Sequence, residues 1–179
     1  LTRQTIQQIY RPARATDHKG TRGHALLVGG SHGKMGAMCL ASSAALRSGC
    51  GLVTALVPDC GYQILQIAVP EAMVLTDPQP NFLTLIQLPF TPDAVGIGPG
   101  MGQEKATREA LLDFLSHHRL PLVIDADALP LVAKRAHGVA VVLEGRRPCP
   151  VRGAECSTVI GQRAPGSVAT YRRALTDSS

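Results

Sequence analysis

The chain has 179 residues, of which 45% are hydrophobic, 17% are charged and 3% are aromatic. This composition excludes a disordered chain, a collagen and a coiled coil, and it indicates one globular core built from aliphatic side chains. The net charge of +5 comes from the end of the chain, because residues 1–130 carry ten basic and ten acidic side chains, whereas residues 131–179 carry eight and three. Most of these late cations are scattered arginines, and tryptophan is absent, so we expect no nucleic-acid partner.

Cysteines and apolar runs bear on the cellular compartment. The cysteines form an odd set without a CxxC pair, which does not favour a zinc site; they are Cys39, Cys50, Cys60, Cys149 and Cys156. Three of them lie among apolar or small residues, where a free thiol serves as a small buried hydrophobe. We therefore expect a reducing, cytoplasmic location. No apolar run approaches the roughly 18 residues that a transmembrane helix needs, and we expect no membrane partner.

Short apolar runs alternate with helical segments along the chain. The opening segment is amphipathic, with Ile6 and Ile9 on one face. The predicted strands are Ala25–Val28, Leu52–Val57, Ala72–Leu75, Ala94–Ile97, Leu122–Ile124 and Val139–Leu143. The clearest predicted helices are Gly36–Arg47 and Glu104–His118. Because the strand runs are apolar on both faces, the pattern predicts an α/β fold with a parallel sheet, helices on both faces and binding loops at the carboxyl ends of the strands.

The first strand runs into a glycine-rich loop in the sequence LLVGGSHGKMGA. This loop is not a G-x-G-x-x-G motif, and it is not a P-loop, because Met35 stands where a P-loop has Ser or Thr. Two interpretations stay open. The loop is either a phosphate cradle, with Gly30, Gly33 and Lys34 near an anion at the start of the helix, or a tight strand-to-helix turn.

A second glycine-rich loop follows a later strand in the sequence GIGPGMGQE. It contains Gly98, Gly100 and Gly102 around a rigid proline, so no large side chain separates a ligand from the backbone N–H groups before the next helix. The alternative is a purely structural turn. Two such loops in one sheet favour a binding role.

Two further groups of polar residues are candidates for the vicinity of a phosphate or a metal ion. Asp125 and Asp127 follow a buried strand in PLVIDADAL, where carboxylates can position Mg²⁺. The alternative is that Asp127 caps the next helix and Asp125 closes a turn. His18 and Lys19 precede the first strand, where they either meet an anionic ligand or form a solvated basic segment.

Read together, these segments resemble a known family. The run HKGTRGHALLVGGSHGKMGAMCLASSAALRSGCGLVT is followed by VPEAM, GIGPGMG and VIDADAL in an order and spacing similar to the bacterial ADP-dependent NAD(P)H-hydrate dehydratases of the ribokinase-like superfamily. The resemblance covers residues 1 to about 130. It implies a ribokinase-like fold and a repair reaction, in which ADP or ATP with Mg²⁺ drives dehydration of (6S)-NADHX or (6S)-NADPHX to NADH or NADPH.

The resemblance also implies site residues and partners. In the family, the Gly-Ala at the start of the first helix and the GPGxG loop contact the hydrate. This carries over to Gly36, Ala37, Gly98, Gly100 and Gly102. The family further implies a homotetramer, and the fused bacterial proteins imply an epimerase domain upstream of Leu1.

The end of the chain departs from the family pattern. Pro130 replaces an Asn, the Thr-Pro-His loop is missing, and Glu144 stands where the nucleotide strand has a Lys. No GxGD loop follows, so the catalytic Asp of the family has no counterpart. We expect residues 1–145 to form an incomplete dehydratase domain, shortened on its C-terminal side by a deletion. We expect residues 146–179 to form a divergent, basic and disordered tail.

These observations leave more than one function open. The resemblance implies ADP-dependent dehydration of NAD(P)H hydrate, which we expect to be impaired in this chain. The alternative is a catalytically inactive remnant that at most binds dinucleotide phosphates through residues 30–37 and 98–102. A vitamin-precursor kinase of the same superfamily would also need a terminal catalytic Asp. A Rossmann dehydrogenase is disfavoured, because no acidic residue follows the first glycine loop at the spacing of about 20 residues that a ribose contact needs.

Overall fold

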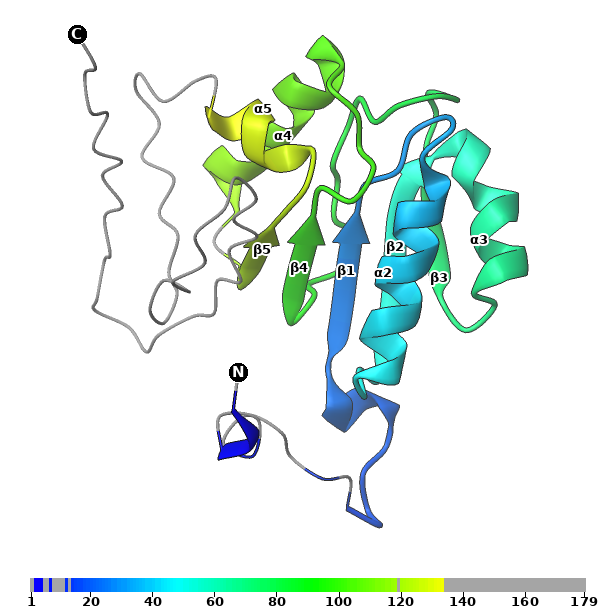
Figure 1. The fold of residues 1–179 in the computed structure, drawn as a ribbon, viewed down its shortest axis with the longest axis vertical. Coiled ribbons are helices and arrows are strands. Elements are labelled where there is room, and N and C mark those ends of the chain that lie inside the picture. Colours follow the sequence, from blue (N-terminus) through cyan, green and yellow to red (C-terminus); the bar gives the residue numbers. More distant parts are fainter. Residues whose placement is uncertain (1, 5–6, 8–11, 13, 119, 134–179) are drawn as a thin grey trace, which may run out of the picture.

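The computed structural model describes residues 2–4, 7, 12, 14–118 and 120–133. Five strands form one sheet, and every pair of neighbours is parallel. The strands are β1 (His24–Val28), β2 (Leu52–Pro58), β3 (Met73–Asp77), β4 (Ala94–Ile97) and β5 (Leu122–Ile124), in the spatial order β3-β2-β1-β4-β5 (Figure 1). The predicted parallel sheet is therefore confirmed.

Helices connect the strands and cover both faces of the sheet (Figure 1). They are α2 (Met35–Arg47), α3 (Tyr62–Ala68), α4 (Lys105–His117) and α5 (Ala128–Ala133), with short 3₁₀ turns η1 (Lys19–Arg22) and η2 (Asp59–Gly61). Among the described residues, no helix combines the length and the apolar character that a membrane crossing requires. Cys39, Cys50 and Cys60 are free thiols, and the other two cysteines lie outside the described residues.

Alternate residues of β2 show how the sheet separates two hydrophobic cores. Val53 and Val57 are buried against α2 and α3, in a cluster that includes Met38 and Leu65. Leu56 points to the other face. Because successive side chains of a strand alternate between faces, a strand that is apolar throughout is buried on both sides, as a parallel sheet requires.

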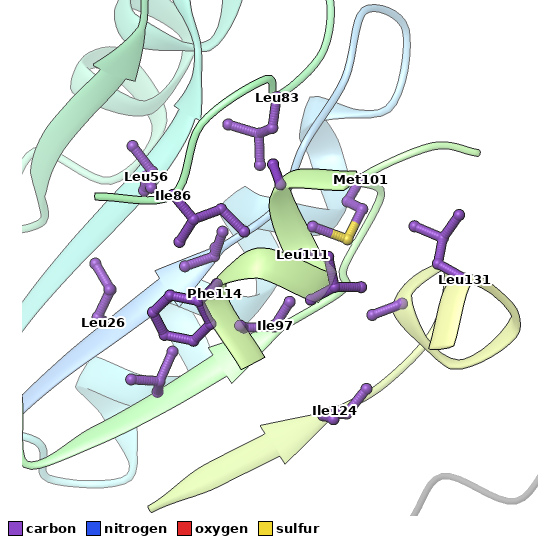
Figure 2. Close-up of a cluster of buried hydrophobic side chains, with 14 residues drawn as sticks. Leu26, Leu56, Leu83, Ile86, Ile97, Met101, Leu111, Phe114, Ile124 and Leu131 are labelled. Atoms are coloured by element: carbon purple, nitrogen blue, oxygen red, sulfur yellow. The ribbon is translucent and has the colours of Figure 1, made fainter. Parts of the chain in front are cut away.

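The second core lies under α4. Figure 2 shows Leu111 and Phe114 of this helix over Leu26 and Ile97 of two adjacent strands. The stripe of apolar side chains at helical spacing drives this packing, and Leu111 is completely buried. The expected apolar face of the 104–118 segment is thus confirmed.

The predicted elements agree with the structure in type but differ at some ends. The strand expected at Ala72–Leu75 begins one residue later and continues to Asp77, and the helix expected from Glu104 begins at Lys105, since Glu104 has an extended backbone. Helices α3 and α5 were not predicted. The expected strand Val139–Leu143, the amphipathic face with Ile6 and Ile9, and the expected tail 146–179 lie outside the described residues.

A buried carboxylate shapes the long connection between β3 and β4. Asp77 is 2% exposed, and its carboxylate accepts hydrogen bonds from the backbone N–H groups of Gln79, Thr84 and Leu85 at 2.6 to 2.8 Å. The Thr84 hydroxyl donates to the same carboxylate at 2.9 Å. This network folds the connection back over the sheet and places Leu83 in the core under α4.

Candidate functional site

The two glycine-rich loops leave the sheet at the point where its winding reverses. β1 and β4 are neighbours, but β1 leads into α2 on one face and β4 leads into α4 on the other. At such a switch point the two connections diverge, and a crevice opens at the carboxyl ends of the strands. We call residues 29–34 the first glycine loop and residues 98–103 the second glycine loop. Both lie at the strand tips in Figure 1.

Hydrogen bonds hold the two loops directly against each other. The Gly30 N–H donates to the Pro99 carbonyl at 2.8 Å, and the Ser31 hydroxyl donates to the Gly100 carbonyl at 2.8 Å. The Gly98 N–H also donates to the Val28 carbonyl at 3.0 Å. The loops therefore form one surface, although about 70 residues separate them in the sequence.

Glycine is required by packing in the second loop. Gly98 has φ of +129°, and a Cβ there would overlap the backbone carbonyl of Asp125. Gly100 has φ of +62°, and its Cβ would lie 2.6 Å from the Lys34 carbonyl oxygen. An L side chain would strain both positions. These contacts support the structural-turn interpretation of the loop, which a binding role does not contradict.

Gly36 is different because nothing packs against it. It lies in the first turn of α2, is exposed, and a Cβ built on it would have no neighbour within 4 Å. Gly33 also has open space, although its φ of +79° favours glycine. No side chain caps the start of α2. The unbonded N–H groups of a helix start next to open space form a surface that favours an anion.

Asp127 connects the two loops to the end of β5. Its Oδ2 accepts a hydrogen bond from the Gly102 N–H at 3.0 Å and lies 3.3 Å from the Lys34 Nζ in an ion pair. Gln103 donates through Nε2 to the Asp127 carbonyl at 2.9 Å. The carboxylate thus neither caps α5 nor stands free for a metal ion, so both interpretations of Asp127 from the sequence missed its contacts.

Asp125 closes a turn, as the alternative interpretation expected. Its carbonyl accepts from the Ala128 N–H at 3.1 Å, and its carboxylate has no hydrogen-bond partner among the described residues. Between the two aspartates, Ala126 has φ of +48°. Within the described part of the chain, no group of three His, Cys, Asp or Glu side chains is placed to hold a metal ion. The two aspartates do not by themselves make a Mg²⁺ site.

His18 and Lys19 lie at the opposite edge of the sheet. His18 accepts a hydrogen bond at Nδ1 from the Gly20 N–H, and Lys19 begins η1 immediately before β1. Figure 1 shows this segment at the amino end of β1, away from the glycine loops. The structure therefore does not bring these two residues together with the other candidates, because the strand separates the two edges.

Two contributions to this edge were not anticipated from the sequence. One is the Ser31 hydroxyl. The other is the β3–β4 connection, where the Asn81 carbonyl accepts from the His32 N–H at 2.8 Å and so fixes the first glycine loop from a third side. Neither residue belongs to a motif that signals a loop contact.

Comparison with known proteins identifies the family. The family model described as NAD(P)H-hydrate dehydratase (Carb_kinase) matches residues 25–146. The bifunctional NAD(P)H-hydrate repair enzyme of Moorella thermoacetica is 39% identical over 127 residues, covering 66% of this chain and 24% of that protein. The ADP-dependent (S)-NAD(P)H-hydrate dehydratase of Lactiplantibacillus plantarum is 38% identical over 130 residues, covering 72% and 45%. The chain thus spans less than half the length of these relatives.

Solved structures agree with this assignment. A ribokinase-like superfamily protein from Enterococcus faecalis has a TM-score of 0.67 at 22% identity, covering 80% of this chain and 50% of the other, which shows the shared fold. The ADP/ATP-dependent NAD(P)H-hydrate dehydratase from Bacillus subtilis, co-crystallised with ATP and Mg²⁺, has a TM-score of 0.62 at 32% identity and covers 72% and 46%. The chain therefore has a ribokinase-like fold and belongs to the NAD(P)H-hydrate dehydratase family.

Proposed function

We propose that the carboxyl edge formed by the two glycine loops binds (6S)-NADHX or (6S)-NADPHX, and that the reaction to which this edge belongs is ADP-dependent dehydration of the hydrate. The observation that carries the proposal is the open space at Gly36, in the first turn of α2 and at the switch point of the sheet. Gly36 and Ala37, together with Gly98, Gly100 and Gly102, are the proposed contacts.

The electrostatics of this edge suit an anionic dinucleotide. The start of α2 carries partial positive charge, and the side chain of Lys34 is 53% exposed beside it. The glycines of both loops allow close approach of the ligand to backbone N–H groups. Gly30, Gly33 and Lys34 are accordingly proposed to lie near a diphosphate.

ADP would supply the phosphoryl group that converts the ring hydroxyl of the hydrate into a leaving group, and such transfer depends mainly on positioning and charge neutralisation. We assign no ADP contacts, since the segment expected to hold the nucleotide lies outside the described residues. The described carboxylates do not fit a Mg²⁺ site, so no step is assigned to a metal ion here.

The second candidate function is binding without turnover. It is favoured by one specific observation, the absence of a GxGD loop in the sequence, which leaves no counterpart for the general base of the family. Loss of a general base slows a reaction by about 100-fold or more. We therefore propose that the chain binds the hydrate and dehydrates it far more slowly than complete relatives do.

The test is incubation of the full chain with (6S)-NADHX, with ADP and Mg²⁺ either present or omitted, while NADH absorbance is recorded. Circular dichroism first establishes that the chain is folded, and titration calorimetry measures hydrate binding in the same preparation. We expect binding, with an ADP-dependent rate about 100-fold or more below that of the Lactiplantibacillus plantarum relative. A folded chain that binds no hydrate refutes the proposal. A rate equal to that of the relative shows that the general base has a replacement.

A further inference from the structure

We infer that Asp127 is a positioning residue for the hydrate site, because its carboxylate joins Lys34 and Gly102 and so sets how the two glycine loops lie relative to each other. This inference rests on the proposed function, since it assigns a role to a residue that does not itself contact the ligand. Three connections meet at one oxygen atom: the loop after β1 through Lys34, the loop after β4 through Gly102, and the turn after β5 through Asp127.

The geometry of Gly102 makes this contact important. Gly102 is buried and has φ of +80°, and it lies two residues before the N-cap of α4. Its N–H points to the carboxylate of Asp127 rather than along the loop. A buried N–H without an acceptor is unfavourable, so the carboxylate stabilises the left-handed conformation with which the second glycine loop ends.

The backbone before Asp127 is strained in a way that fits this role. Ala126 has φ of +48° and is the only non-glycine residue with positive φ in the described part of the chain. A left-handed alanine is disfavoured, and such conformations persist where the surrounding structure requires them. Here the conformation belongs to the turn that brings the Asp127 carboxylate to Gly102 and Lys34.

The ion pair adds orientation rather than stability. The Lys34 and Asp127 side chains are 53% and 28% exposed, and exposed pairs of this kind contribute little to the free energy of unfolding. A lysine side chain has several rotatable bonds, however, and a partner 3.3 Å away selects among its conformations. Asp127 therefore keeps the ammonium group between the two glycine loops, where the diphosphate is proposed to bind.

The first measurement needs no ligand. Amide hydrogen exchange of the full chain, read by NMR, is compared between wild type and Asp127→Ala, with the core amide of Leu111 as a reporter of global stability. We expect the Gly102 amide to exchange about tenfold faster in the variant, at unchanged Leu111 exchange. Asp127→Asn retains an oxygen acceptor and is expected to keep the Gly102 amide protected. Equal Gly102 exchange in wild type and Asp127→Ala overturns the inference.

The second measurement separates orientation of the cation from the mere presence of charge. Lys34→Met is expected to weaken (6S)-NADHX binding about fivefold in titration calorimetry, and Lys34→Arg is expected to restore it. The matched control is Lys105→Met, which removes a cation from an exposed pair with Glu109 in α4 and should leave binding unchanged. If the two Met variants behave alike, the inference is overturned. If folded wild type binds no hydrate, the proposed function fails, while Gly102 exchange still decides the role of Asp127.

Discussion

Replacing Gly36 with leucine is expected to block hydrate binding while leaving the fold intact. No atom lies within 4 Å of a Cβ at this position, so the larger side chain meets no obstacle in the free protein. Leucine is also a better helix former than glycine, and we expect the free energy of unfolding to rise by about 0.5 kcal/mol. For a domain of this size, that corresponds to an increase in Tm of about 2 °C.

The effect on binding has the opposite sign and a larger size. The leucine side chain would occupy the space from which an anion reaches the first N–H groups of α2. Loss of one hydrogen bond to a charged group costs about 2 kcal/mol, which weakens binding about 30-fold. The assay is titration calorimetry with (6S)-NADHX, together with thermal unfolding of the same samples.

The matched control for Gly36→Leu is Ala44→Leu, which adds bulk to an exposed position of the same helix, two turns further from its start. This variant should bind the hydrate like wild type. Equal affinities of the two leucine variants would refute the placement of the ligand at the start of α2. A large loss of stability in Gly36→Leu would instead contradict the open space described there.

Three further predictions concern stability and reactivity. Gly98→Ala should lower the free energy of unfolding by about 2 kcal/mol or more, because its Cβ would overlap the Asp125 carbonyl, whereas Gly33→Ala, which has open space, should cost less; urea denaturation compares the two, and equal costs would contradict the packing argument. Asp77→Ala should lower it by about 3 kcal/mol, since buried hydrogen-bond donors lose their acceptor; an unchanged urea midpoint would show that the network is dispensable. Burial raises the pKa of the Cys60 thiol, so less thiolate is present at pH 8 than in free cysteine; iodoacetamide labelling followed by mass spectrometry should be slower than for free cysteine and accelerate at higher pH, and labelling as fast as free cysteine would be inconsistent with burial.

The strands and long helices could be predicted because their signals are local. The runs Ala94–Ile97 and Leu122–Ile124 are short and apolar, and the structure gives them the predicted bounds. Helix α3 gave no such signal, since Leu65 is buried while its apolar neighbours Ile64 and Ile67 are exposed, and no clear stripe results. Periodicity predicts an element only where burial follows it.

The site could be predicted only in part, because its decisive contacts are not local. Glycine-rich loops after two strands predict a ligand-binding edge, and the structure places both loops at the switch point. The ion pair between Lys34 and Asp127 joins residues 93 positions apart, and no spacing rule connects them. His18 and Lys19 illustrate the reverse case, in which residues near a motif in the sequence lie at the other edge of the sheet.

The most direct test of hydrate binding at the glycine loops is hydrogen–deuterium exchange of the full chain with and without (6S)-NADHX, read by mass spectrometry. We predict that the hydrate slows exchange in peptides that cover residues 29–37 and 98–103, and leaves peptides that cover residues 14–24 unchanged. Slower exchange at residues 14–24 alone, or no change in a chain that is saturated with the hydrate, would contradict binding at the switch point of the sheet.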